Sequence, residues 1–561
     1  DQDFGHYQAG GEWARIDEPA LTMALRQSAN DVAQGKVEIG GAARERIGQR
    51  LSYAAVGRAM ANSLRDTMRG IGGGRVARLS VRLQRGIPVE QANFAPHLGV
   101  SILAADGSIA PNEPRAIEGG WILFAPAGSV LAPNVLDLVA HYAGQRPDAA
   151  IFYGDDVAAY TTHAIDQVRL KPEFDRSLLI AQDYVGAPLI IRAAALEQIG
   201  TLDPAHGTAA LADLLFRANA AGLSIARIPH VLLAHPGERI AARPDDYARM
   251  LRAQPGLGEA IVPGRTPNSF ALQHAFAAET APAVTIVVPT CRSTLPAGEG
   301  TYVERLLAEI SRTDWPMDRL TVIIGDDGED TPAWALAKWP FTLQHIVTAR
   351  APDEPFNYAA KMNRLWRAAE TEHLVLMNDD CKPLATHWLK ALMSFAIDSS
   401  VGGVGARLLY DDGRLQHAGL APHGPAAAHV WLFRPDSDGT YQDWALVQRE
   451  WSMVTGAVFA TRRSVMEQAD GFEERFSLEF NDTDLCLRLR TMGYRIVCTP
   501  MAEMIHSEKA SRGQRLPPGD EVALFLSRWR GWLDNDPAWH PWLRRDCFEM
   551  TPGIDTQAWY L

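Results

Sequence analysis

Three features that would assign the sequence to a familiar class are scarce in it. Its 561 residues contain only five cysteines, and these are far apart. Such spacing suits neither a disulfide framework nor a zinc cluster, so we expect reduced thiols in a cytosolic protein. No uninterrupted apolar run approaches the roughly 18 residues of a membrane-spanning helix. Peripheral contact with the inner face of a cell membrane is left open.

Basic residues are in deficit as well. The chain has 54 lysines and arginines against 67 aspartates and glutamates, a formal net charge of -13. Such a chain has no overall positive potential to attract a phosphate backbone, so nucleic acid is not an expected partner. An anionic small substrate would need a local cation instead.

The length exceeds what one hydrophobic core usually holds, so several domains are expected. Apolar residues three and four apart predict amphipathic helices from Glu18 to about Arg69, before a glycine-rich hinge. From about Val76 onward, strand-like and helix-like runs alternate, which is typical of α/β domains. The predicted parts are a helical segment (residues 1–75), two α/β domains (76–275 and 281–513) and a C-terminal helical extension (514–561).

The two α/β regions resemble each other. Matching residues keep their order at an offset of 270 that becomes 271 after a one-residue gap. The matches include Gly186 with Gly456, Arg192 with Arg462, Asp213 with Asp484, Arg217 with Arg488, and His235 with His506. Such an ordered series favours internal duplication over chance similarity between alanine-rich helices.

In the second region, acidic residues follow two apolar strands. Val322 to Gly325 runs into Asp326, and His373 to Met377 runs into Asn378-Asp379-Asp380. The carboxyl ends of parallel strands share a sheet edge, where ligands bind in open α/β domains. Neighbouring carboxylates repel each other, so a divalent cation that also binds a diphosphate would explain the pair. A solvated turn is the alternative.

Two further candidates follow along the chain. Asp482 and Asp484 stand at the start of a predicted helix, where the helix dipole favours acids. Either could be a helix cap, and we assign that role to Asp484. His506 comes after another strand-like run, where a lone histidine is more often structural, so its interpretation depends on the other motifs.

Taken in order, these motifs resemble those of bacterial family 2 glycosyltransferases, above all the rhamnosyltransferase-like enzymes of O-antigen and capsule assembly. The resemblance covers about residues 284–543 and implies an α/β, Rossmann-like GT-A fold, here as two tandem domains. The matching motifs are Val287-Val288-Pro289-Thr290, Ile324-Gly325-Asp326, Asn378-Asp379-Asp380, Gln416-His417-Ala418-Gly419, Thr455-Gly456-Ala457, Asn481-Asp482-Thr483-Asp484 and His506 through Ser511-Arg512-Gly513.

The resemblance implies a role for each matching residue. Asp482 would be the catalytic base, and Asp380 with His506 would hold Mg²⁺ or Mn²⁺. The donor-binding residues would be Pro289, Thr290, Arg292, Asp326, Lys361, Asn363, Asp379 and Arg512. The acceptor-binding residues would be His417, Trp451 and Gly456, with His429 as a further candidate. Large aromatic residues such as Trp451 are equally typical of a protein core.

The first α/β region lacks these acids. Pro126, Ala127 and Gly128 occupy the positions of the acidic triplet, and Leu211 occupies that of Asp482. We therefore expect a degenerate, non-catalytic glycosyltransferase-like domain. A rearranged site that uses Asp155 and Asp156 is the alternative.

The implied function is inverting, metal-dependent hexosyl transfer. The donor would be a nucleoside-diphosphate sugar, and the acceptor a glycan or lipid-linked saccharide in bacterial surface polysaccharide assembly. One base and one direct displacement invert the anomeric carbon. The alternatives are a carbohydrate-binding or scaffold protein with inactive domains, and a metal-dependent nucleotidyltransferase. The sequence does not predict an oligomeric state.

Overall fold

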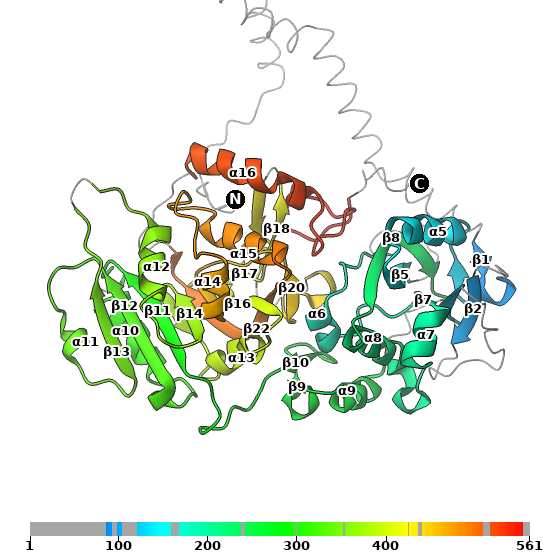
Figure 1. Ribbon diagram of the computed structural model, residues 1–561, viewed down its shortest axis with the longest axis horizontal. Coiled ribbons are helices and arrows are strands. Elements are labelled where there is room, and N and C mark those ends of the chain that lie inside the picture. The colour runs from blue at the N-terminus through cyan, green and yellow to red at the C-terminus, as the bar shows by residue number, and fades with distance from the viewer. Residues whose placement is uncertain are drawn as a thin grey trace, which may run out of the picture. The chain divides into compact units, whose positions relative to one another are not determined.

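The computed structural model describes residues 86–553, apart from gaps at 93–97, 104–119, 159–167, 237–241, 297, 299, 352–353, 425, 436–439 and 509–516. The predicted helical segment 1–75 and Arg512 lie outside the described residues. Residues Leu79–Leu561 belong to one compact unit. This unit contains two large mixed sheets, coloured blue to green and green to orange in Figure 1.

The first sheet has the strand order β1-β4-β8-β5-β7-β3-β2, and β6 pairs with β5. Its strands are β1 (Ile87–Pro88), β2 (Leu98–Leu103), β3 (Trp121–Pro126), β4 (Val130–Leu131), β5 (Ala149–Val157), β6 (Val168–Arg169), β7 (Leu189–Arg192) and β8 (Ser224–Ala234). The helices of this half are α5 (Val135–Gln145), α6 (Arg176–Ala181), α7 (Ala193–Ile199), α8 (Ala210–Ala220) and α9 (Pro244–Ala253). A small pair, β9 (Ile261–Pro263) and β10 (Phe270–Leu272), leads to the second half.

The second sheet has the order β13-β12-β11-β14-β21-β16-β22-β15, with β17 on β16 and β20 on β22. Its strands are β11 (Val284–Thr290), β12 (Leu320–Asp326), β13 (Thr342–Val347), β14 (His373–Met377), β15 (Cys381–Pro383), β16 (Val401–Leu409), β17 (Leu415–His417), β20 (Arg449–Trp451), β21 (Val458–Arg462) and β22 (Arg495–His506). A separate pair is β18 (Leu420–His423) with β19 (Ala426–His429). The helices are α10 (Tyr302–Ile310), α11 (Ala333–Leu336), α12 (Tyr358–Trp366), α13 (Trp388–Ala396), α14 (Arg463–Gln468), α15 (Asn481–Thr491) and α16 (Gly519–Asp534).

The sequence explains the central strands and the helices beside them. Strands β5 and β16 are buried at every position, as expected of strands that are covered on both faces. Helix α10 begins with a capping box in which Thr301 and Glu304 exchange hydrogen bonds, and it buries its apolar side. The core therefore lies between each sheet and its helices.

The two large sheets share one strand order. Strands β2, β3, β7, β5, β8 and β4 correspond to β11, β14, β21, β16, β22 and β15, and every neighbouring pair keeps its direction. The register agrees too, because Trp121 pairs with Arg192 as His373 pairs with Arg462. The prediction of two tandem α/β domains of one fold is confirmed.

A pair of side chains is also repeated. Arg217 donates to Asp213 at 2.8 Å in the first half, and Arg488 donates to Asp484 at 2.8 Å in the second. Each arginine also binds carbonyl groups just after the preceding helix. Asp484 further accepts from Trp529 of α16 at 2.8 Å, and the N-cap position of α15 is occupied by Phe480. Its predicted role as a helix cap is therefore wrong, because an internal ion pair uses the carboxylate.

Polar contacts connect the two halves. Glu450 of β20 accepts from Ser177 of α6 at 3.2 Å and from Arg495 at 2.9 Å. Asp175 accepts from the Glu450 backbone N–H at 2.8 Å, and burial together with the Glu450 carboxylate raises the pKa of Asp175 to about 8. From the C-terminal extension, His540 reaches the buried Asp155 at 2.9 Å. The first half is thus tied to the second through buried charged groups.

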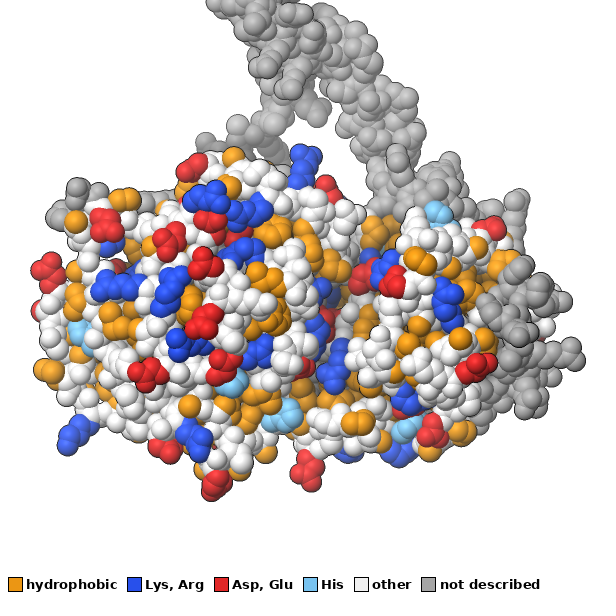
Figure 2. All heavy atoms as spheres, viewed as in Figure 1, with side chains coloured by type: hydrophobic (Ala, Val, Ile, Leu, Met, Phe, Trp, Pro, Cys, Tyr) orange, Lys and Arg blue, Asp and Glu red, His pale blue; other side chains and the backbone are white. Residues whose placement is uncertain are grey.

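On the face shown in Figure 2, basic and acidic side chains are interspersed over the surface. Within the described part of the chain, no helix combines the length and the apolar character needed to cross a bilayer.

Candidate active site

The site lies where three neighbouring parallel strands of the second sheet end. Thr290, the last residue of β11, pairs with Asp326, the last residue of β12, and Pro289 pairs with Gly325. Strand β14 runs on the other side of β11 and leads into the acidic triplet. Thr290 Oγ1 donates to Asp379 Oδ2 at 2.6 Å. Burial raises the pKa of Asp379 to about 6, although the Thr290 hydrogen bond opposes that shift.

Asp326 is held by cationic and polar neighbours. Arg292 donates to both carboxylate oxygens, at 2.7 to 3.0 Å, and His345 lies 2.8 Å from Oδ2. Burial alone would raise the pKa of Asp326, but Arg292, the Gly328 N–H and His345 hold it below its ordinary value. A Cβ at Gly328 would lie 2.3 Å from the Arg292 guanidinium carbon, so a larger residue there would displace the Arg292 side chain.

Lys361 of α12 connects this group to the β11 end. Its Nζ donates to the Thr290 carbonyl at 3.0 Å and to Asp327 at 2.8 Å. Five predicted donor-site residues therefore form one connected network: Thr290, Arg292, Asp326, Lys361 and Asp379. Sequence reasoning missed Asp327 and His345, although both stand on or beside the strands whose ends had been identified.

Asn363 does not belong to this network. Its amide donates to the Phe472 carbonyl and to Glu474, and its oxygen accepts from Trp366 and from the Phe472 N–H. All four hydrogen-bonding positions are thus used within the protein, three by the segment after α14 and one by Trp366 of α12. Its amide therefore has no group left for a ligand, and the predicted donor-binding role of Asn363 gains no support from its hydrogen bonds.

The predicted metal ligands do meet. Asp380 Oδ1 lies 3.2 Å from His506 Nε2, at the edge where β15 pairs with β22. Both side chains are buried, and His506 is the neighbour that faces Oδ1. Burial by itself would raise the pKa of Asp380, but His506 outweighs it and keeps that pKa below its ordinary value.

Gln416 fixes the orientation of the His506 ring. Its amide nitrogen donates to Glu508 at 3.2 Å, so its oxygen faces His506 Nδ1 at 2.8 Å. A carbonyl oxygen only accepts, so Nδ1 carries a proton and Nε2 is the nitrogen directed at Asp380. A partner of this kind typically holds a metal-binding histidine in place. Gln416 belongs to one of the motifs identified in the sequence, but the sequence alone assigns it no role.

These groups fit a divalent cation. Asp380 Oδ1 and His506 Nε2 face each other, and both can donate electron pairs to a metal ion once the Nε2 proton is lost. Cys381 is the third potential ligand in this cluster, whose ligand atoms lie within 4.8 Å of one another. Burial raises the pKa of the Cys381 thiol well above its ordinary value, so it stays protonated and a poor ligand. The oxygen and nitrogen donors suit Mg²⁺ or Mn²⁺.

Asp482 lies in the first turn of α15. Its Oδ2 accepts from the Gly456 N–H at 2.7 Å, and its Oδ1 accepts from the Thr483 N–H at 2.7 Å. A Cβ at Gly456 would lie 3.1 Å from the Asp482 Cβ. Gly456, predicted to bind the acceptor, thus uses its N–H to orient the predicted base.

Two other acceptor-site predictions are corrected by burial. Trp451 is 1% exposed and packs edge-on against Trp431, with the Arg449 guanidinium 3.9 Å from its ring centre. It is a core residue, with no surface for a sugar. His417 is 0% exposed, and its Nδ1 lies 2.9 Å from Nδ1 of the partly exposed His429. Direct contact between His417 and an acceptor is therefore excluded.

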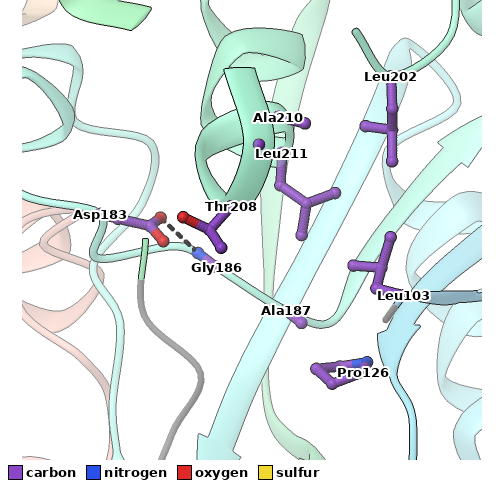
Figure 3. Close-up of a pocket in the computed structure, with 10 residues that line it drawn as sticks. Leu103, Pro126, Asp183, Gly186, Ala187, Leu202, Thr208, Ala210 and Leu211 are labelled. Atoms are coloured by element: carbon purple, nitrogen blue, oxygen red, sulfur yellow. Dashed lines mark hydrogen bonds between the residues drawn. The ribbon is translucent and has the colours of Figure 1, made fainter. Parts of the chain in front are cut away.

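The first half has a pocket at the equivalent place (Figure 3). By strand register Pro126 matches Asn378, so Ala127 and Gly128 match the two acids. Leu211, two residues before Asp213, matches Asp482, and it lines the pocket. The Gly186 N–H, equivalent to that of Gly456, donates instead to Asp183 at 3.0 Å.

The alternative of a rearranged site at Asp155 and Asp156 finds no support. Asp156 pairs with Arg169 at 2.6 Å and with Lys171 at 2.8 Å. Asp155 accepts from His540 and from the Lys171 backbone N–H. Protein groups already satisfy both carboxylates, so neither needs a metal ion.

Comparison with known proteins finds a family match for the same part of the chain. Residues 282–517 match the profile of the family described as Glycosyltransferase like family 2. This segment of the chain, which is similar to family 2 of the glycosyltransferases, holds every acid of the candidate site.

Particular relatives extend over more of the chain. An uncharacterized protein, y4gI, of Sinorhizobium fredii is 30% identical over 80% of this chain and 51% of its own length. The O-antigen biosynthesis protein RfbC of Myxococcus xanthus is 29% identical over 81% of this chain and 37% of its own. The chain thus spans about half of the first relative's length and 37% of the second's.

Two further similarities each cover less than half of the chain. An N-acetylglucosaminyl-diphospho-decaprenol L-rhamnosyltransferase of Mycobacterium tuberculosis is 24% identical over 42% of this chain and 82% of its own length. The solved structure of the mannosyltransferase PcManGT of Pyrobaculum calidifontis is 19% identical, covers 46% of this chain and 72% of that protein, and has a TM-score of 0.30.

Proposed function

We propose that the protein is an inverting, metal-dependent glycosyltransferase that acts in bacterial surface polysaccharide synthesis, such as that of O-antigen or capsule. The observation that carries this proposal is the combination of Asp380 facing His506 with Asp482 at the start of α15. It provides a metal site and a separate carboxylate base in one family 2 domain. A scaffold with two inactive domains would need neither the metal site nor the carboxylate base.

In this reaction Asp482 accepts the proton of an acceptor hydroxyl while that oxygen attacks the anomeric carbon. The bond from the anomeric carbon to the diphosphate breaks, and the nucleoside diphosphate leaves with the electron pair. Asp380 and His506 would hold a divalent cation, which would supply Lewis-acid stabilisation of the leaving charge. Direct displacement on one face inverts the configuration.

The chain's own residues prepare this step. The Gly456 and Thr483 N–H groups hold the Asp482 carboxylate, so its orientation does not depend on substrate. Gln416 holds the His506 ring with Nε2 toward Asp380. Lys361 and Arg292 place positive charge at the strand ends, where a diphosphate donor would bind. Pro289 and Asp379 would lie against the nucleoside and the donor sugar, as the family resemblance implies.

The substrate class rests on the relatives. One is named for O-antigen biosynthesis and another for rhamnosyl transfer to a lipid-linked N-acetylglucosamine. We propose a nucleoside-diphosphate sugar donor, with rhamnose as the first candidate, and a saccharide or lipid-linked saccharide acceptor. The first half, whose equivalent pocket has Leu211 in place of a base, is proposed as a non-catalytic domain.

The test is nucleotide release from a panel of nucleoside-diphosphate sugars with Mn²⁺ or Mg²⁺ and with an excess of EDTA. A transferase releases nucleoside diphosphate only with metal, and NMR of the product shows an inverted anomeric centre. A nucleotidyltransferase would release pyrophosphate from a nucleoside triphosphate instead. A protein that binds saccharides but turns over no donor would be the scaffold alternative.

A further inference from the structure

Two histidines, the buried His417 and the half-buried His429, lie on the side of the site that holds Asp482. His417 ends β17 and His429 ends β19, and their rings meet nearly perpendicular, with centres 4.9 Å apart. The two Nδ1 atoms are 2.9 Å apart, so one carries the shared proton and the other accepts it. His417 Nε2 lies 3.4 Å from the Thr455 N–H.

The backbone contact decides which nitrogens carry protons. A peptide N–H only donates, so His417 Nε2 must accept from Thr455. The proton of a neutral His417 is therefore on Nδ1, and it is donated to His429 Nδ1. The proton of a neutral His429 is then on Nε2, at the far side of its ring. Burial lowers the pKa of both rings, which keeps them neutral near pH 7.

The surroundings of His429 place its ring near the active site. Asp482, Glu508 and His506 all act electrostatically on its ring. Thr455, which orients His417, directly precedes Gly456, which orients Asp482. The substrate closest to the base is the acceptor, since its hydroxyl loses the proton. His429 is also partly exposed, whereas His417 is not.

We propose that His429 binds the acceptor sugar by donating a hydrogen bond from Nε2 to a hydroxyl oxygen, and that His417 is a positioning residue that fixes the His429 ring. This inference rests on the proposed transferase function. It adds two statements to that function. His429, and not the buried His417, contacts the acceptor, and the contact is a hydrogen bond donated by a neutral N–H. The recognised group is a hydroxyl oxygen, not a phosphate or carboxylate.

The first measurement is independent of any substrate. In the full chain labelled with ¹⁵N-histidine, NMR at pH 7.5 should show His417 protonated on Nδ1 and His429 on Nε2, with H429F and H417N used to assign the signals. A His429 ring protonated on Nδ1 would overturn the proposal, because its exposed nitrogen could then only accept.

The second measurement is kinetic and uses the acceptor that the wild-type chain glycosylates in the donor assay. H429F removes the donor but keeps an aromatic ring, and should raise the acceptor KM about tenfold, as loss of one hydrogen bond does. The Mn²⁺-dependent donor Kd should change less than twofold. H429Q keeps an N–H near the Nε2 position and should recover most of the loss.

A matched control is His423 on the paired strand β18, whose ring stacks on Phe548. H423F should leave the acceptor KM unchanged. An unchanged acceptor KM in H429F, or an equal loss of donor affinity, would overturn the assignment of His429. Absence of nucleotide release by the wild-type chain from every donor would instead overturn the proposed function, and the NMR result would still show whether His429 presents an N–H.

Discussion

Replacement of Asp482 by asparagine isolates the proton-transfer step. The carboxylate accepts two backbone N–H groups, from Gly456 and Thr483, both at 2.7 Å. An amide offers one acceptor, so one of these bonds is lost and the free energy of unfolding should fall by about 1 kcal/mol. The amide cannot take a proton from a hydroxyl, so kcat should fall by about 10²- to 10⁴-fold. Donor affinity with Mn²⁺ should change little, because the metal ligands are untouched.

The assay is nucleotide release at saturating donor and acceptor, with calorimetry for donor binding and urea unfolding for stability. The matched control is Asp183→Asn, since Asp183 accepts the equivalent glycine N–H in the first half, at 3.0 Å from Gly186. That variant should keep near-normal turnover. Turnover within a few-fold of wild type in Asp482→Asn would refute Asp482 as the base, and loss of turnover in Asp183→Asn would refute a non-catalytic first half.

Three further predictions concern the metal site, the glycine beside the base and the contact between the halves. Asp380→Asn should weaken Mn²⁺ binding at least about tenfold in calorimetry, because it removes a charged ligand; unchanged affinity would place the metal elsewhere. Gly456→Ala puts a Cβ 3.1 Å from that of Asp482, so it should lower kcat about tenfold with only a small change in the urea midpoint. A normal kcat would show that this contact does not position Asp482. His540→Phe removes the side-chain donor to the buried Asp155 and should cost about 2–3 kcal/mol in unfolding free energy. A loss below about 0.5 kcal/mol would mean that the contact adds little.

Much of the fold could be read from the sequence because its signals are local. Unbroken β-branched runs such as Val284–Thr290 specify strands that are buried on both faces, and acids directly after them are placed at a sheet edge by chain connectivity. The internal repeat was visible because Asp213 with Arg217 and Asp484 with Arg488 keep their spacing. That spacing survives in both halves because each arginine holds the same turn after a helix.

The errors arose where a residue type has two common uses. The side chains of Trp451, His417 and Asn363 all suit a sugar site by chemistry. Each of them instead makes its contacts with other residues of the protein. A sequence does not report how much of a side chain is buried, so it could not distinguish a ring in the core from a ring in a groove. Gln416 was overlooked for the opposite reason, because its importance lies wholly in the partner that it orients.

The sequence by itself determined the strand ends, the acids that follow them and the loss of those acids in the first half, since all of these depend on the order of residues along the chain. Tertiary structure alone decided which side chains meet. It brought Asp380 within 3.2 Å of His506, 126 positions further along the chain, and satisfied Asp155 with a histidine from the C-terminal extension. Contacts of this range depend on how strands and helices pack, and packing is a property of the whole core.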